Sequence, residues 1–258
     1  MELDRNYYFL TAALPPLVFG EEPPISFREC RRMLEENLSE ADQKRVKQLF
    51  FSVDLRNIRA FWLNEPFDER GNFGTKELEE ELLVRDQLPL YVVEFLDRYP
   101  LLEERLRYFA ALYALYYSES VVQLTGFLRS YCEFEREMRL VLTGLRAKRT
   151  GGRIAYELQF EDPRDPFVVH LFAQEDAAEY SPPQEYEELK EIFVEHGKMP
   201  YMLEKALLAY RFKRVVELEE ATGRSIDEIL GYLVRLGIVE AYRALEKRRP
   251  DIVQTIGE

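Results

Sequence analysis

Two acidic residues, Asp54 and Glu135, lie among apolar and aromatic neighbours, where a carboxylate can act as an acid or base or hold a cation. Asn57 and Arg59 follow the first acid, and Arg139 follows the second. Because a buried carboxylate usually needs a cationic partner, we expect these acids to pair with an arginine such as Arg59 or Arg139. Catalysis and a contact at a partner interface are the alternatives. Asp54 and Asn57 share a helix face, and we predict that Asp54, Asn57 and Arg59 hold a helix junction.

The segments around these acids, residues 51–59 and 131–139, share an order of aromatic residue, acid and arginine. This similarity fits a duplicated helical hairpin, and it fits two ordinary amphipathic helices equally. The spacing leaves both interpretations open.

The sequence patterns of common catalytic and cofactor sites are missing. The chain has no glycine-rich phosphate loop, no dinucleotide fingerprint and no G-x-S-x-G motif. Its only histidines, His170 and His196, are not part of an H-E-x-x-H motif. We therefore predict no catalytic residue, no cofactor and no metal, and we do not expect an enzyme.

The charge balance limits the choice of partners. The chain has 258 residues, with 35 Lys and Arg against 48 Asp and Glu, which gives a net charge of -13. Such a surface repels nucleic acid and anionic lipid, so we expect neither as a general partner. The longest apolar run, residues 109–117, is far below the ~20 residues of a spanning helix, so we expect no direct membrane insertion.

Most of the chain reads as helix. Capping patterns at Ser26, Ser39, Ser181 and Ser225 predict helix starts, and Pro200 opens a further helix. Glycines and prolines predict the ends of helices, including an interruption at Gly237. Residues 101–149 are typical of nearly continuous helix with a break near 118–120.

One segment departs from the helical pattern. Residues 154–160 alternate between apolar and polar, which is typical of a strand. We therefore predict an all-α or nearly all-α fold with a short β element near 153–172. We expect a single helical domain, 1–258, built from pseudo-repeats of about 1–100, 101–180 and 181–258. The two cysteines, Cys30 and Cys132, lie on apolar faces and are expected to be reduced.

Two basic groups close helices near the middle and the end of the chain. Each is either a solvated helix end or a contact with an acidic partner. The groups are Arg146, Lys148 and Arg149, and then Lys247, Arg248 and Arg249.

Four segments in order resemble the C/d family of V-type and archaeal-type ATPase subunits. The opening at 7–17, YYFLTAALPPL, is similar to a "YY-x-L-x-x-x-LP-x-L" pattern of bacterial proteins found with V-type ATPase subunits. Residues 134–148 are similar to "FE-x-x-LRN-x-L-x-x-LRA-x-K", 54–58 to "D-x-x-N-[LI]", and 225–240 to "S-x-D-x-[IV]L-x-YL". Leu140 stands where the family often has Asn, and the chain is short for a typical member. The resemblance is therefore to a divergent, shorter bacterial relative.

The resemblance implies an all-helical, funnel-like bundle of pseudo-repeated helical hairpins, with helix at 154–160. It also implies a non-catalytic part of the complex that links the soluble ATPase sector to the membrane rotor ring. The implied partners are the central-stalk subunits and the ring, and the implied location is cytoplasmic and peripheral to the inner membrane. A free-standing helical scaffold or regulator derived from that family is the alternative function.

Overall fold

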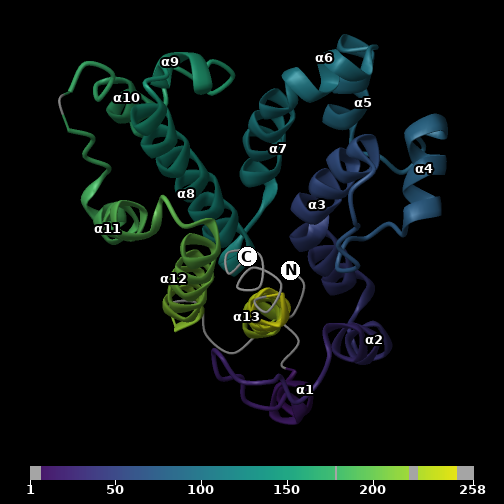
Figure 1. The fold of residues 1–258 in the computed structure, drawn as a ribbon. Coiled ribbons are helices and arrows are strands. Elements are labelled where there is room, and N and C mark those ends of the chain that lie inside the picture. The colour runs from purple at the N-terminus through teal and green to yellow at the C-terminus, as the bar shows by residue number, and fades with distance from the viewer. Residues whose placement is uncertain (1–6, 178, 221–225, 249–258) are drawn as a thin grey trace, which may run out of the picture.

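The computed structural model describes residues 7–177, 179–220 and 226–248. Throughout these ranges the regular elements are helices, which confirms the predicted all-α fold. Two groups of helices diverge upward from a common base, so the molecule resembles a V in Figure 1. We call these groups arm one and arm two.

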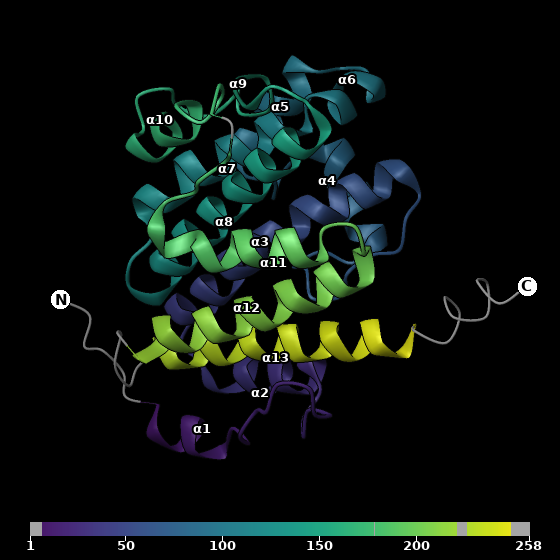
Figure 2. The same cartoon turned by 60° about the vertical axis from the view of Figure 1, so that its left-hand side comes forward.

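The base is formed by segments from distant parts of the chain. It contains α1 (Tyr8–Ala13), α2 (Phe27–Asn37) and α13 (Ile226–Lys247). The first half of α3 (Glu40–Leu63), the start of α8 (Gly126–Thr150) and the second half of α12 (Pro200–Glu220) complete it. Because α13 is apolar over most of its circumference, it is buried at the centre of this core and is covered on several sides (Figure 2).

Arm one has an aromatic core. The second half of α3 packs there with α4 (Thr75–Val84), α5 (Leu90–Arg98), α6 (Leu102–Arg107) and α7 (Phe109–Gln123). Rings from α3, α5 and α7 make edge contacts, which aromatic side chains prefer over stacking face to face. The base therefore continues into arm one through α3.

Arm two is built on the second half of α8 and the first half of α12. The short helices α9 (Ile154–Glu157) and α10 (Pro166–Phe172) lie near its tip. A 3₁₀ turn, η1 (Gln184–Tyr186), and α11 (Glu187–His196) complete it. The core of arm two extends from Phe134 to Tyr210 without a contribution from the earlier part of the chain, apart from the partly buried Tyr131.

The two similar sequence segments occupy corresponding places. In α3, Val53 is buried in the base core and Leu55 in the core of arm one. In α8, Cys132 is buried in the base core and Phe134 in the core of arm two. Each segment therefore lies where a long helix leaves the base and enters an arm. The duplication itself stays a prediction.

The β element near 153–172 was a wrong prediction, because residues 154–157 form α9, a turn follows, and 166–172 form α10. Ile154 and Leu158 are both buried, and their spacing of four residues places them on one side of a single helical turn. The alternation of apolar residues therefore continues over a helix and a turn.

Other expected boundaries also move. The break near 118–120 lies instead at Leu124 and Thr125, followed by Gly126 with a φ of 60°. Gly237 does not interrupt α13; its missing Cβ leaves room for Arg70, whose Nη1 would lie 3.1 Å from such an atom. Ser181 does not cap a helix, because the turn there begins after Pro183. Ser225 lies outside the described residues.

The remaining expectations on helix starts and cysteines agree with the structure. Ser26 forms a capping box with Glu29, Ser39 caps α3, and α12 begins at Pro200. Cys30 and Cys132 are free and buried. Among the described residues, we find no helix with the length and apolar character needed to cross a membrane.

Candidate functional site

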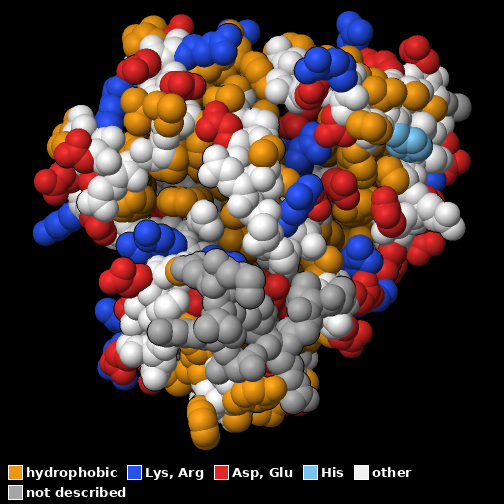
Figure 3. All heavy atoms as spheres, turned by 180° about the vertical axis from the view of Figure 1, so that it is seen from behind, with side chains coloured by type: hydrophobic (Ala, Val, Ile, Leu, Met, Phe, Trp, Pro, Cys, Tyr) orange, Lys and Arg blue, Asp and Glu red, His pale blue; other side chains and the backbone are white. Residues whose placement is uncertain are grey.

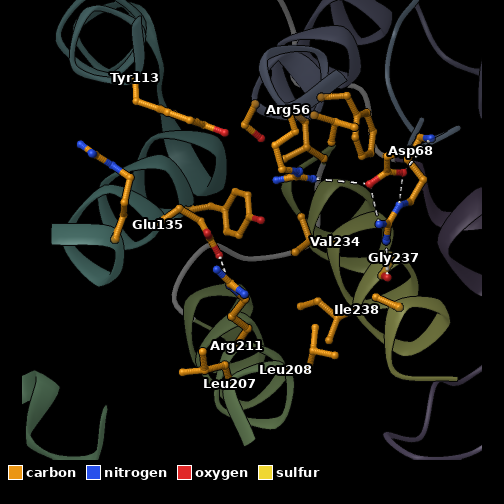
Figure 4. Close-up of a pocket in the computed structure, with 18 of the residues that line it drawn as sticks. Arg56, Asp68, Tyr113, Glu135, Leu207, Leu208, Arg211, Val234, Gly237 and Ile238 are labelled. Carbon is orange, nitrogen blue, oxygen red and sulfur yellow. Dashed lines mark hydrogen bonds and ion pairs between the residues drawn. The ribbon is translucent and has the colours of Figure 1, made fainter. Parts of the chain in front are cut away.

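A cleft of about 510 Å³ lies where both arms join the base. Figure 4 shows side chains from α3, α7, α8, α12, α13 and the loop before α4 pointing into it. The lining is of three kinds: apolar side chains, tyrosines and charged residues. The charged residues are Arg56, Asp68, Arg70, Glu135, Arg139, Arg146, Glu204 and Arg211.

The apolar part of the cleft comes mainly from α12 and α13. Leu207 and Leu208 face the cleft from α12, while Val234 and Ile238 face it from α13. Leu142 adds an apolar side chain from α8. A bound group could therefore bury apolar surface in the cleft while it contacts the charges around it.

The charge of the cleft is opposite to that of the chain. Five arginines line it against three carboxylates, whereas the whole chain has 13 more acidic than basic residues. From behind, Lys and Arg side chains also appear along the middle of the molecule, between acidic groups on either side (Figure 3). The cleft is therefore a locally cationic site in an acidic protein.

Two of these arginines are held by one carboxylate from the loop before α4. Asp68 Oδ2 lies 2.7 Å from Arg70 Nη2 and 3.6 Å from Arg56 Nη2. Arg70 also donates a hydrogen bond to the Gly237 carbonyl of α13. The loop thereby joins arm one to the base at the wall of the cleft.

A second ion pair joins arm two internally across the cleft wall. Arg211 Nε donates to Glu135 Oε1 at 3.0 Å, so α12 is tied to α8. The carboxylate raises the pKa of Arg211 and outweighs the opposing effect of burial. Burial also raises the pKa of Tyr131 beside this pair, so its phenol is neutral and able to donate a hydrogen bond.

Arg139 connects the two arms. Its guanidinium donates to Glu161 of arm two and lies over the rings of Tyr113 and Tyr117 of arm one, 5.7 and 5.5 Å from their centroids. Glu161 is 8% exposed, and it also accepts from Arg136 Nη2 at 3.1 Å. One buried carboxylate therefore holds two arginines of α8.

Arg146 differs from the other four arginines of the cleft. It is exposed, and among the described residues no acceptor lies within hydrogen-bonding distance of its guanidinium. Of the cationic groups in the cleft, it is the one most available to a ligand.

Asp54 and Asn57 hold the loop that forms one wall of the cleft. Asn57 donates to the Asp68 carbonyl and accepts from the Asp68 N–H, both at 2.9 Å. Asp54 accepts from the backbone N–H and the side-chain amide of Asn72, both at 2.6 Å. From α2, Arg31 donates to the Gly71 carbonyl at 2.8 Å. The loop is therefore fixed to both α3 and α2.

Burial raises the pKa of Asp54 to about 6, although the hydrogen bonds from Asn72 and Phe73 act in the opposite direction. The expected ion pair of Asp54 with Arg59 or Arg139 was wrong, because its hydrogen-bond partners are amides. Arg59 is half exposed and lies 3.9 Å from Glu65. It therefore does not belong to the junction.

The pairing of Glu135 with Arg139 was also wrong, because Glu135 holds Arg211 and Arg139 holds Glu161. Glu161 and Arg211 lie 22 and 76 residues from their partners in sequence. Local spacing in the sequence carries no signal for pairs that far apart.

The basic groups expected to face a partner divide into internal and exposed residues. Lys148 donates to the carbonyls of Glu175 and Ala177, and Arg149 donates to that of Gly197. Lys247 lies 3.5 Å from Glu22 across an exposed surface. Arg248 is exposed, and Arg249 lies outside the described residues.

Among the described residues, no group of three or more His, Cys, Asp or Glu side chains is arranged to hold a metal ion. No solved structure matches the chain.

Three similar proteins come from chlamydiae, and each is described only as an uncharacterized protein. The one from Chlamydia muridarum is 30% identical over 253 residues, which cover 94% of each chain. The one from Chlamydia trachomatis is 30% identical over 236 residues, with 88% of this chain and 87% of the relative covered. The one from Chlamydia pneumoniae is 29% identical over 216 residues, with 81% of each covered. The model of DUF2764, described as a protein of unknown function, matches residues 5–257, so the chain belongs to this family.

Proposed function

We propose that this chain is a non-catalytic coupling subunit of a V-type or archaeal-type ATPase. In this role it links the central stalk of the soluble sector to the membrane rotor ring. The sequence resemblance of the four ordered segments suggests the complex. The observation that carries the proposal is the charged and partly apolar cleft at the junction of two helical arms, because such a cleft suits a protein segment as its occupant.

The arrangement of the cores also suits a part that must transmit force. The long helices α3 and α8 each extend from the base core into an arm core, so a displacement of the base is transmitted to both arms. Arg139 joins the arms to each other through Glu161 and the tyrosines of α7. These contacts resist separation of the arms, which force transmission requires.

The net charge of -13 favours attachment through proteins over attachment to lipid. We propose that the chain acts on the cytoplasmic side of the inner membrane, held there by the stalk and the ring. The exposed cations Arg146, Lys247 and Arg248 are available for such contacts, whereas Lys148 and Arg149 are used within the chain.

A pull-down of tagged chain from detergent-solubilised native membranes tests this proposal. Central-stalk and ring subunits should be recovered together, and the tag alone should recover neither. Recovery of neither by a well-folded chain would contradict the proposal and favour the free-standing scaffold. Flotation of the chain with purely anionic vesicles would contradict attachment through proteins.

A further inference from the structure

We propose that the cleft binds the acidic end of an amphipathic helix of a partner protein. The inference deepens the proposed function, on which it rests only for the identity of the partner. It specifies the chemistry that the cleft recognises: carboxylates beside an apolar helical face.

The walls of the cleft have the dimensions of a helix-binding groove. On α8, Glu135, Arg139, Leu142 and Arg146 line the cleft at intervals of four, three and four residues. They therefore form one stripe along that helix, about 16 Å long at 1.5 Å per residue. The occupant can contact this stripe over about three helical turns.

The apolar residues of the cleft select an amphipathic occupant. Leu142 lies one turn from Arg146 on the same face of α8, and α12 and α13 supply the other apolar side chains. A small inorganic anion would leave these groups facing water. A helix with an apolar stripe would cover them, as in other helix-in-groove complexes.

The charges select an acidic end on that helix. Asp68, Glu135 and Glu161 already hold four of the cleft arginines, which leaves Arg146 as the cation without a partner among the described residues. One or a few carboxylates match this small excess of positive charge. A phosphate backbone would meet repulsion from the rest of a chain whose net charge is -13.

The acidic surface outside the cleft contributes to specificity. An acidic helix is repelled from most of the surface and attracted to the cleft, so wrong docking positions are disfavoured. A basic helix would bind widely over the surface instead.

Fluorescence polarisation with designed peptides tests this inference on the full chain. The probe is a labelled amphipathic helix with leucines on one face and glutamates at one end. The comparison peptide replaces each glutamate by glutamine. We expect the glutamate peptide to bind at least about tenfold more tightly, and its affinity to fall as salt rises.

Two charge reversals locate the binding site. Arg146→Glu should weaken the glutamate peptide by about tenfold or more, because it places a like charge in the cleft. The matched control is Arg164→Glu, since Arg164 is exposed on the loop before α10 and lies outside the cleft. The control should bind as the wild type does. Because Arg146 is exposed, its variant should keep the wild-type melting temperature, and Arg146→Gln provides a milder second variant.

Equal binding of both peptides, no binding of the glutamate peptide at millimolar concentration, or equal losses from both reversals would overturn the inference. These results are separable from those on the proposed function. If the pull-down recovers stalk and ring subunits and Arg146→Glu does not reduce the yield, the proposed function stands and this inference fails. If the peptide binds in the cleft and the pull-down recovers no part of an ATPase, this inference stands and the proposed function fails.

Discussion

Removal of the Asp54 charge should change how the stability of the protein depends on pH. The carboxyl group is 4% exposed and its pKa is raised from 3.8 to about 6. At 1.36 kcal/mol per pKa unit, ionisation of Asp54 in the folded state carries a cost of about 3 kcal/mol well above pH 6. The variant Asp54→Asn has no such cost, because its amide does not titrate.

The sign of the effect follows from proton uptake. Between pH 3.8 and about 6 the folded state holds the Asp54 proton more tightly than the unfolded state, so wild-type stability rises as pH falls through this range. Relative to Asp54→Asn, the wild type should gain about 1.4 kcal/mol between pH 8 and pH 5. The amide also loses one hydrogen bond from Asn72, which shifts the difference equally at every pH.

Urea unfolding of both proteins at several pH values between 8 and 5 measures this difference. The comparison cancels the titration of the other carboxylates, since both proteins contain them. A difference in unfolding free energy that is constant over this range would refute the reasoning, because Asp54 would then have an ordinary pKa. A wild type that loses stability relative to the variant as pH falls would refute the sign.

Three further predictions concern other contacts and the absence of nucleotide binding. Glu161→Ala should lower the unfolding free energy by about 3–5 kcal/mol in urea titrations, because it leaves two arginines of α8 without their buried carboxylate. Gly144→Ala should cost about 1–3 kcal/mol, since the new Cβ would lie 2.7 Å from the Tyr180 ring, whereas Gly152→Ala, with ordinary contacts, should melt near the wild type. Calorimetric titration of the pure chain with Mg-ATP should be flat, because its sequence lacks a phosphate-binding loop, and micromolar binding would contradict this.

Features encoded by neighbouring residues could be predicted from the sequence. The capping box at Ser26, the start of α12 at Pro200 and the buried cysteines depend on local chemistry and on apolar spacing. The short alternation at 154–160 was misleading because seven residues fit a helix and turn as well as a strand. Gly237 was misleading for a different reason: the glycine serves a contact with Arg70, 167 residues away.

The candidate cleft could be predicted only in part. Glu135, Arg139 and Arg146 were selected from their apolar or basic surroundings, and the structure places all three in its lining. Arg56, Arg70 and Arg211 were missed as site residues, because an arginine on a helix or loop looks the same in sequence whether it faces water or a cleft. Their role depends on which elements the fold brings together.

The division into three cores has a consequence for the order in which the chain folds. The core of arm one is formed by residues 55–117, with only a peripheral contact from beyond it, and that of arm two by residues 134–210. The base core needs residues from Leu10 to Tyr242, so it closes only after nearly the whole chain has been synthesised. During synthesis the arms can therefore become compact while α2 and the first half of α3 still expose the apolar faces that later cover α13. These faces form the stretch of the nascent chain most in need of a chaperone.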